Sequence, residues 1–234
     1  MSLLGIVVAM KEEVSSILDS MHIEKEVLIS TIRYYVGNFK GKKIVVSICG
    51  IGKVNAAVGT QSLILNFNPD FILNIGLAGA AAPKLFVGNL VIAKEVVQHD
   101  VDTTALGDPL GMVSTVNIVK FQCSKDLTEK FFNNLKSKSK VFLGTVASGD
   151  KFLKEKSVIN IVRKNFKVLA VDMESGSIAQ VCYLNKVKFC CLKIISDSVF
   201  STESGSVAGC YNKSKENFPD SFCDLLKDFI NILD

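Results

Sequence analysis

Short apolar runs rich in valine and isoleucine alternate along this chain with longer amphipathic segments. Strands buried on both faces are continuous apolar runs, and the helices that cover them are amphipathic. The alternation therefore predicts a layered α/β fold. The expected strands are residues 3–9, 43–49, 71–75, 89–97, 141–147, 167–171 and 188–195. The expected helices are residues 11–21, 53–67, 125–135, 152–165, 174–184 and 213–233.

The 234 residues contain no linker rich in proline, glycine or serine, so we expect residues 1–234 to form one domain. The 27 basic and 23 acidic residues give a net charge of +4, too small and too dispersed to indicate nucleic-acid binding. The basic stretch KSKSK at 136–140, with Lys151, Lys154 and Lys156 after it, is typical of a solvated surface. Polyanion binding at this stretch is the minor alternative.

The seven cysteines and two histidines have no metal-binding spacing, and an odd number of cysteines does not fit a disulfide framework. We expect buried thiols in a reducing compartment, and no metal. The apolar N-terminal run lacks the basic leader and cleavage site of a signal peptide, so it is interpreted as the first strand. No run of about 18 apolar residues is uninterrupted, and we expect no membrane span.

Polar or glycine-rich segments follow six of the predicted strands. They read AMKEE, CGIGK, NIGLAG, ASGDKF, VDMES and ISDS. In open α/β sheets, ligands bind in the crevice beyond the carboxyl ends of the strands, where such segments converge. The convergence of the six predicts a binding site there.

The carboxylates in these segments each have two interpretations. Glu12 and Glu13 stand where a strand gives way to a helix, and so do Asp172 and Glu174. An acidic residue there caps the helix or complements its dipole, which needs no function. Asp197 follows a buried strand, and a buried carboxyl with a raised pKa is what a general acid needs. Capping is the alternative for Asp197 as well.

The glycines and Phe152 are equally open to interpretation. Gly50 and Gly52 favour a tight turn whose backbone NH groups could bind an anion, and a purely structural turn is the alternative. The same holds for Gly76 and Gly79, and none of the four completes a Walker or dinucleotide motif. Phe152 fits either the core or a ring-stacking position. No GxSxG or Cys/His signature indicates acyl chemistry.

Six segments together resemble one family in order and spacing: AMKEEV at 9–14, SICGIGKVNAA at 47–57, HDVDTTALG at 99–107, SGDKFL at 148–153, VDMES at 171–175 and ISDS at 195–198. The family is the bacterial 5'-methylthioadenosine/S-adenosylhomocysteine nucleosidases, of the nucleoside phosphorylase superfamily. The resemblance implies a single α/β/α domain with a central mixed, twisted sheet. It also implies a cytoplasmic, cofactor-free enzyme that hydrolyses the N-glycosidic bond of methylthioadenosine, S-adenosylhomocysteine and 5'-deoxyadenosine, in methionine salvage and methyl-cycle detoxification.

The resemblance implies roles for the matching residues. Glu13 would activate the attacking water, and Asp197 would bind the adenine and protonate N7 as it leaves. Glu174 would hold the ribose hydroxyls, with Met173 beneath the sugar. Further substrate contacts are implied for Met10, Ile51, Ala78, Gly79, Phe152 (stacking on the adenine), Leu153, Lys193 and Ser196. Family members are homodimers in which the loop around Leu106 closes the partner's pocket for the 5'-substituent.

These residue types suit the chemistry. Cleavage develops positive charge on the ribose and negative charge on the base, so an acid should meet the base and anions should flank the sugar. Attack by water on the opposite face resembles inverting glycosidases. The superfamily's phosphate-dependent purine nucleoside phosphorylases are the alternative, but they need cations where the nucleophile binds. Glu13 would repel phosphate there, which favours hydrolysis.

Two residues depart from the family's pattern. Leu77 stands where the family usually has Ser or Thr, and Lys193 stands where it usually has Arg, whose donor geometry differs. Both positions lie near the sugar and the water in the family, so a weakly active paralogue retained as a binding protein is a further alternative. Segment 200–214 does not match, and the residue that covers the pocket is not identified.

Overall fold

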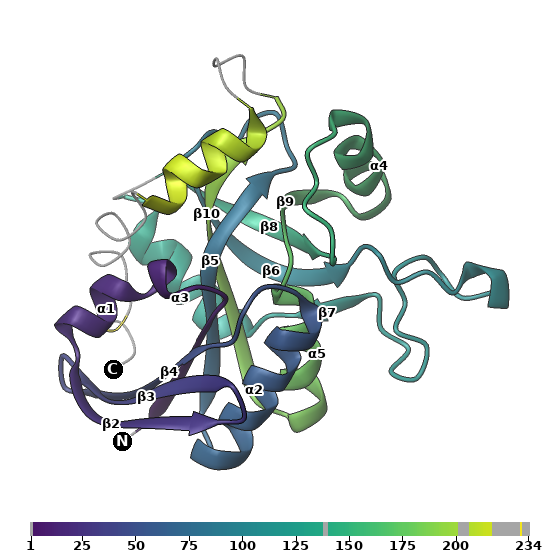
Figure 1. Ribbon diagram of the computed structural model, residues 1–234. Coiled ribbons are helices and arrows are strands. Elements are labelled where there is room, and N and C mark those ends of the chain that lie inside the picture. The colour runs from purple at the N-terminus through teal and green to yellow at the C-terminus, as the bar shows by residue number, and fades with distance from the viewer. Residues whose placement is uncertain (1, 138–139, 201–205, 217–229, 231–234) are drawn as a thin grey trace.

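The computed structural model describes residues 2–137, 140–200, 206–216 and 230. Over these residues a ten-stranded mixed sheet is covered by helices, which confirms the predicted fold class (Figure 1). The strands are β1 (Leu3–Val8), β2 (His22–Ile29), β3 (Ile32–Phe39), β4 (Lys42–Ile48), β5 (Phe71–Ala80), β6 (Leu90–Gln98), β7 (Lys120–Gln122), β8 (Val141–Ser148), β9 (Val168–Asp172) and β10 (Lys188–Ser198). The helices are α1 (Ser15–Ser20), α2 (Lys53–Phe67), α3 (Lys125–Leu135), α4 (Lys156–Phe166) and α5 (Ser175–Asn185), with the 3-10 helices η1 (Lys11–Glu13) and η2 (Thr104–Leu106) and a helical segment over 207–216.

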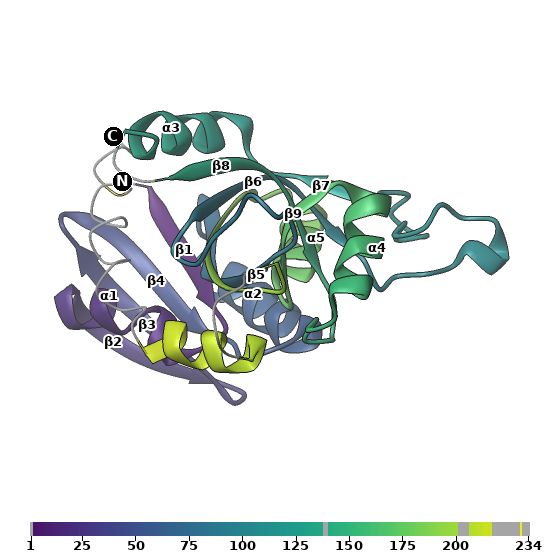
Figure 2. The same ribbon diagram turned by 90° about the horizontal axis from the view of Figure 1, so that it is seen from above.

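Part of the sheet closes on itself. The strand order is β10-β6-β8-β9-β5-β1-β4-β3-β2, with β7 beside β6, and β10 also pairs with β5. Strands β5, β10, β6, β8 and β9 therefore form a ring, seen nearly end-on in Figure 2. Because every strand of a ring is paired on both sides, the closure fixes where the strand ends lie relative to one another.

Alternate residues of the central strands face different helical layers. On β1, Ile6 packs in one core with side chains of α1 and α3, whereas Val7 packs in another with side chains of α2 and α5. On β10, Cys190 and Cys191 divide between the same two cores. Burial on both faces explains why these strands are continuous apolar runs.

The region between the first and second predicted strands differs from the expectation. The helix expected over 11–21 is divided into η1 and α1, because Val14 between them has a non-helical φ of −139°. The hairpin of β2 and β3 follows, where no strand was predicted. Strand β2 reads HIEKEVLI and is mostly exposed, so it lacks the apolar run that marks a buried strand.

Three further boundaries differ. Strand β5 continues to Ala80 and β10 to Ser198, so NIGLAG and ISDS lie within strands, and the interpretation of Gly76 and Gly79 as a turn is wrong. Helix α4 begins at Lys156, four residues after the expected start. The helix expected over 213–233 lies mostly outside the described residues. None of the described helices is long and apolar enough to cross a membrane.

Candidate active site

A cavity of about 250 Å³ opens where β1, β4, β5, β9 and β10 end. Most of the residues that the sequence singled out line it: Met10, Glu13, Ile51, Ala78, Gly79, Phe152, Met173, Glu174, Ser196 and Asp197. Leu153 lines a smaller cavity of about 30 Å³ that shares Phe152, Met173 and Asp197 with the first. The predicted convergence of the strand ends therefore brings these residues together.

Glu13 is fixed by backbone donors on both of its carboxylate oxygens. Its Oε2 accepts hydrogen bonds of 3.0 Å from the NH groups of Ala9 and Met10, and its Oε1 accepts one of 3.0 Å from Leu77 NH. These contacts form because η1 turns back directly after β1, next to β5. Burial raises the pKa of Glu13, while Lys193 and the three NH groups oppose that rise. The result is a buried carboxylate in one fixed orientation.

Asp197 enters the cavity from a β-bulge. Along β10, Ile195 is paired with Ala78 and Asp197 with Gly79, so Ser196 is the additional residue. Burial raises the pKa of Asp197, and the hydroxyl of Ser196, 2.6 Å from Asp197 Oδ1, opposes the rise. A buried carboxyl with a raised pKa is suited to a general acid. The bulge, and not a helix cap, accounts for its position.

The two acids of VDMES have different roles. Asp172 Oδ2 accepts a hydrogen bond of 3.1 Å from Ser175 NH in the first turn of α5, so it supplies the capping interaction. Glu174 makes no side-chain cap, and its Oε1 instead accepts a hydrogen bond of 2.9 Å from Gly52 NH, which follows β4. Burial, with the charge of Asp172, raises the pKa of Glu174 to about 7. The capping interpretation therefore holds for Asp172 and is wrong for Glu174.

Lys193 and Leu106 line neither of these two cavities, unlike the other expected site residues. Lys193 is only 1% exposed, and its ammonium group is bound to Asp172 with an Nζ–Oδ2 distance of 2.8 Å. It thus lies behind the cavity wall. Leu106 is 83% exposed on η2, in the arm that extends away from the body between β6 and β7 (Figure 1).

Tyr211 lines the cavity and was missed in the sequence. It lies on helical segment 207–216, packs edge-on against Phe152 with ring centroids 5.6 Å apart, and directs its hydroxyl at Met10 Sδ, 3.5 Å away. Among the described residues of segment 200–214, it is the one that lines the cavity. The only signal in the sequence was an aromatic ring in a polar stretch. Asp172 also lines the cavity, although only its capping interpretation was retained from the sequence.

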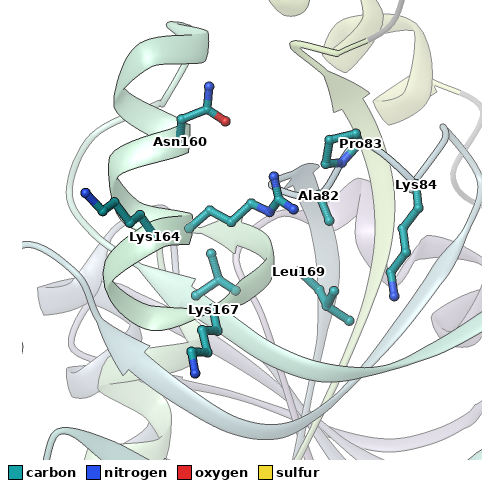
Figure 3. A pocket seen from close by; sticks show the side chains of 9 residues that line it. Ala82, Pro83, Lys84, Asn160, Lys164, Lys167 and Leu169 are labelled. Atoms are coloured by element: carbon teal, nitrogen blue, oxygen red, sulfur yellow. The ribbon is translucent and has the colours of Figure 1, made fainter.

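A larger cavity of about 680 Å³ lies between α4 and the residues after β5, but its lining does not suit catalysis. Its charged lining residues are Lys84, Arg163, Lys164 and Lys167, and no acid lines it among the described residues. Figure 3 shows Lys84 and Lys164 on opposite sides of it. Arg163 and Lys164 are in the last turn of α4, where cations complement the helix dipole.

The comparisons with known proteins agree with this site. Residues 3–230 match the phosphorylase superfamily. A 5'-methylthioadenosine/S-adenosylhomocysteine nucleosidase of Desulfotalea psychrophila is 38% identical over 214 residues, which cover 91% of this chain and 90% of the relative. The same enzyme of Staphylococcus aureus (strain MRSA252) is 36% identical over 197 residues, covering 83% of this chain and 86% of the relative.

Solved structures give the same result. A mutant of the Helicobacter pylori nucleosidase, with 5'-methylthioadenosine in its active site, superposes with a TM-score of 0.91 at 28% identity, covering 99% of both chains. Futalosine hydrolase of Helicobacter pylori superposes with a TM-score of 0.90 at 29% identity, covering 98% of this chain and 97% of that one. The chain thus belongs to the phosphorylase superfamily. Within it, the chain is a member of the 5'-methylthioadenosine/S-adenosylhomocysteine nucleosidase family and an N-glycosyl hydrolase.

Proposed function

We propose that the protein hydrolyses 5'-methylthioadenosine and S-adenosylhomocysteine, and also 5'-deoxyadenosine, to adenine and the 5-substituted ribose. The observation that carries the proposal is the placement of three buried carboxylates, Glu13, Glu174 and Asp197, around one cavity. An N-glycosidic bond needs an acid at the base, anions near the sugar and a base for water, and the three supply these functions. In the cell, this reaction would serve methionine salvage and methyl-cycle detoxification in the cytoplasm.

Asp197 is the proposed general acid. As the bond to the ribose breaks, negative charge develops on the adenine, and protonation at N7 neutralises it. The raised pKa of the buried Asp197 supports this role, because a higher pKa favours the protonated form that a general acid needs. Its hydrogen-bond neighbour Ser196 would hold the carboxyl in place. Phe152 would stack against the adenine, and Leu153 would contact its edge through the backbone.

Glu13 is the proposed general base, and Glu174 would bind the ribose hydroxyls above Met173. Three backbone NH groups hold the Glu13 carboxylate at the cavity, where it would bind and activate a water molecule. Both anions would stabilise the positive charge on the ribose in the transition state. Leu77 donates its NH to Glu13, so its apolar side chain takes no part in holding the base.

Hydrolysis is favoured over phosphorolysis by the charge of the cavity. Among the described residues, no lysine or arginine lines it, and the nearest buried cation, Lys193, is paired with Asp172. A phosphate dianion would therefore meet carboxylates and no cation in the lining of the cavity. Water has no such requirement.

A homodimer is part of the proposal. Large apolar side chains are exposed on the neighbouring helices α2 and α5: Val54, Val58, Leu65, Tyr183 and Leu184. Ile51, which lines the cavity, is exposed just before α2. Burial of this surface against a second copy would remove apolar area from water and bring the partner's arm, with Leu106, to the open side of the cavity.

The test is adenine release by the purified protein in phosphate-free buffer, with and without added phosphate. The substrates are methylthioadenosine, S-adenosylhomocysteine, 5'-deoxyadenosine and futalosine, the last because futalosine hydrolase shares the fold. We expect phosphate-independent release from the thioadenosines. Strict phosphate dependence would identify a phosphorylase, exclusive use of futalosine would change the substrate, and absence of turnover would identify a paralogue retained for binding.

A further inference from the structure

Lys193 carries a buried ammonium group that has no role in the proposed reaction. Acidic side chains surround it. The charged or titratable groups that act on it are Asp172 on β9, Cys191 on its own strand, Glu174 and Glu13. Burial alone would lower the pKa of Lys193, but these groups outweigh burial and hold that pKa above its ordinary value. The lysine is therefore a permanent cation behind the cavity.

Asp172 holds this cation in place. Its Oδ1 accepts hydrogen bonds from the hydroxyls of Ser148, at 2.5 Å, and Ser175, at 3.0 Å. Its Oδ2 accepts from Ser175 NH and binds Lys193 Nζ. Four donors hold this buried carboxylate in one orientation. Lys193 consequently has one defined position instead of several.

Gly76 allows the cation and the proposed base to approach each other. It is paired with Lys193 across β5 and β10. A Cβ atom built on Gly76 would lie 2.6 Å from Glu13 Oε1 and 3.3 Å from Lys193 Nζ. Both charged groups therefore lie against the same bare Cα atom, and a larger residue would separate them.

We propose that Lys193 is a positioning residue which, anchored by Asp172, neutralises Glu13 and Glu174 from behind the cavity without touching the substrate. The inference rests on the proposed function, because it assigns Lys193 a role in keeping the general base ionised. In a buried site with little screening, the charge of Lys193 acts on these carboxylates without direct contact. A lysine is sufficient to stabilise the ionised carboxylates, since this electrostatic effect requires a positive charge and not the planar donor geometry of arginine.

The test compares the pH dependence of kcat/KM for methylthioadenosine between pH 5 and 9.5. In Lys193→Gln the cation is lost, so the carboxylates hold their protons to higher pH. We expect the acid limb to move upward by about one pH unit or more, with about tenfold or greater loss near pH 6 and recovery at alkaline pH. Lys193→Arg keeps the charge and should keep the wild-type acid limb. A loss that is uniform across pH in Lys193→Gln would overturn the proposal.

Asp172→Asn is the matched control. It breaks the same buried ion pair from the other side but keeps the cation, so its acid limb should stay or move downward. An upward shift equal to that of Lys193→Gln would show that the pair matters only as structure. If Lys193→Gln does not fold, the double variant Asp172→Asn with Lys193→Gln replaces it, because it leaves no unpaired charge buried.

A second readout separates this inference from the proposed function. Titration of ¹³C-labelled glutamate carboxyls by NMR follows Glu13 and Glu174 without any turnover. We expect a higher titration midpoint in Lys193→Gln than in the wild type, and unchanged midpoints would overturn the inference. Absence of adenine release by the wild type would instead refute the proposed function alone.

Discussion

Gly79 of β5 lies directly across from Asp197 of β10, and a Cβ atom built on Gly79 would come within 3.1 Å of Asp197 Oδ2. Gly76 has the same relationship to Lys193 on these strands. The two glycines of NIGLAG are thus matched to the two charged residues of β10. Their lack of a side chain leaves the room that Asp197 occupies at the cavity and that Lys193 and Glu13 occupy beside Gly76.

Replacement of Gly76 by alanine should cost activity, since the new methyl group would overlap the Glu13 carboxylate and push it off its NH donors. A misplacement of about 1 Å at a catalytic group lowers kcat/KM by about 100-fold. Kinetics of adenine release would measure the effect. Gly209→Ala, in the exposed helical segment, is the control and should keep activity. Equal activity in both variants would contradict the role given to Gly76.

Asp197→Asn should abolish most turnover while leaving the fold intact. The amide cannot donate the carboxyl proton to N7, and loss of a general acid lowers rates by about 10² to 10⁴-fold. Asn is close in size to the protonated carboxyl, so the melting temperature should not fall. Adenine release and thermal unfolding measured on one preparation would check both statements. Near-normal turnover would remove Asp197 as the acid.

Relative to the wild type, Glu174→Gln should be more stabilising at pH 8 than at pH 5. The folded pKa of Glu174, about 7, exceeds its ordinary value of 4.5, so between these values the folded state keeps a proton that the unfolded chain loses. Its contribution to stability is therefore greatest below pH 4.5 and is lost as the pH rises through 7. Melting temperatures of Glu174→Gln and the wild type at the two pH values would measure this effect. A melting temperature of the variant that exceeds that of the wild type by more at pH 5 than at pH 8 would contradict the prediction.

Tyr211→Ala should raise KM for methylthioadenosine by about tenfold, because loss of the ring opens the cavity beside Phe152 and Met10. Tyr211→Phe keeps the ring and should stay close to the wild type. Steady-state kinetics of the pair would separate the ring from the hydroxyl. An unchanged KM in Tyr211→Ala would mean that Tyr211 does not cover the bound substrate.

The proposed dimer is open to a direct test by light scattering. Val54→Asp, on the exposed face of α2, should halve the molar mass and raise KM, because the partner's arm would be lost. Leu106→Ala should raise KM without changing the mass. Leu28→Asp, at an exposed position on β2 and not on α2 or α5, is the control and should change neither. A wild-type protein with monomer mass would refute the dimer.

The central strands and the site segments could be predicted because their causes are local. Continuous apolar runs reveal strands buried on both faces, and polar or glycine residues at their ends reveal where a cavity opens. Glu13 and Glu174 were found by this reasoning with the resemblance beside it. The hairpin of β2 and β3 was not, because an edge strand with one exposed face carries too weak an apolar pattern.

Contacts between distant segments could not be predicted. The bond from Gly52 NH to Glu174 joins residues 122 positions apart, and the pair of Asp172 and Lys193 depends on the pairing of β5 with both β9 and β10. No pattern along the chain encodes either distance. The bulge at Ser196 is similar, since one additional residue becomes visible only when both partner strands are known.

That additional residue separates two kinds of chemistry on one strand. In a regular strand Lys193 and Asp197 would share a face, whereas the insertion of Ser196 reverses the alternation between them. The ammonium group acts on Glu13 and Glu174, while burial and the Ser196 hydroxyl act on Asp197. A single extra residue thus places the proposed acid on the opposite face of the strand from the cation, whose positive charge would lower the pKa of that acid.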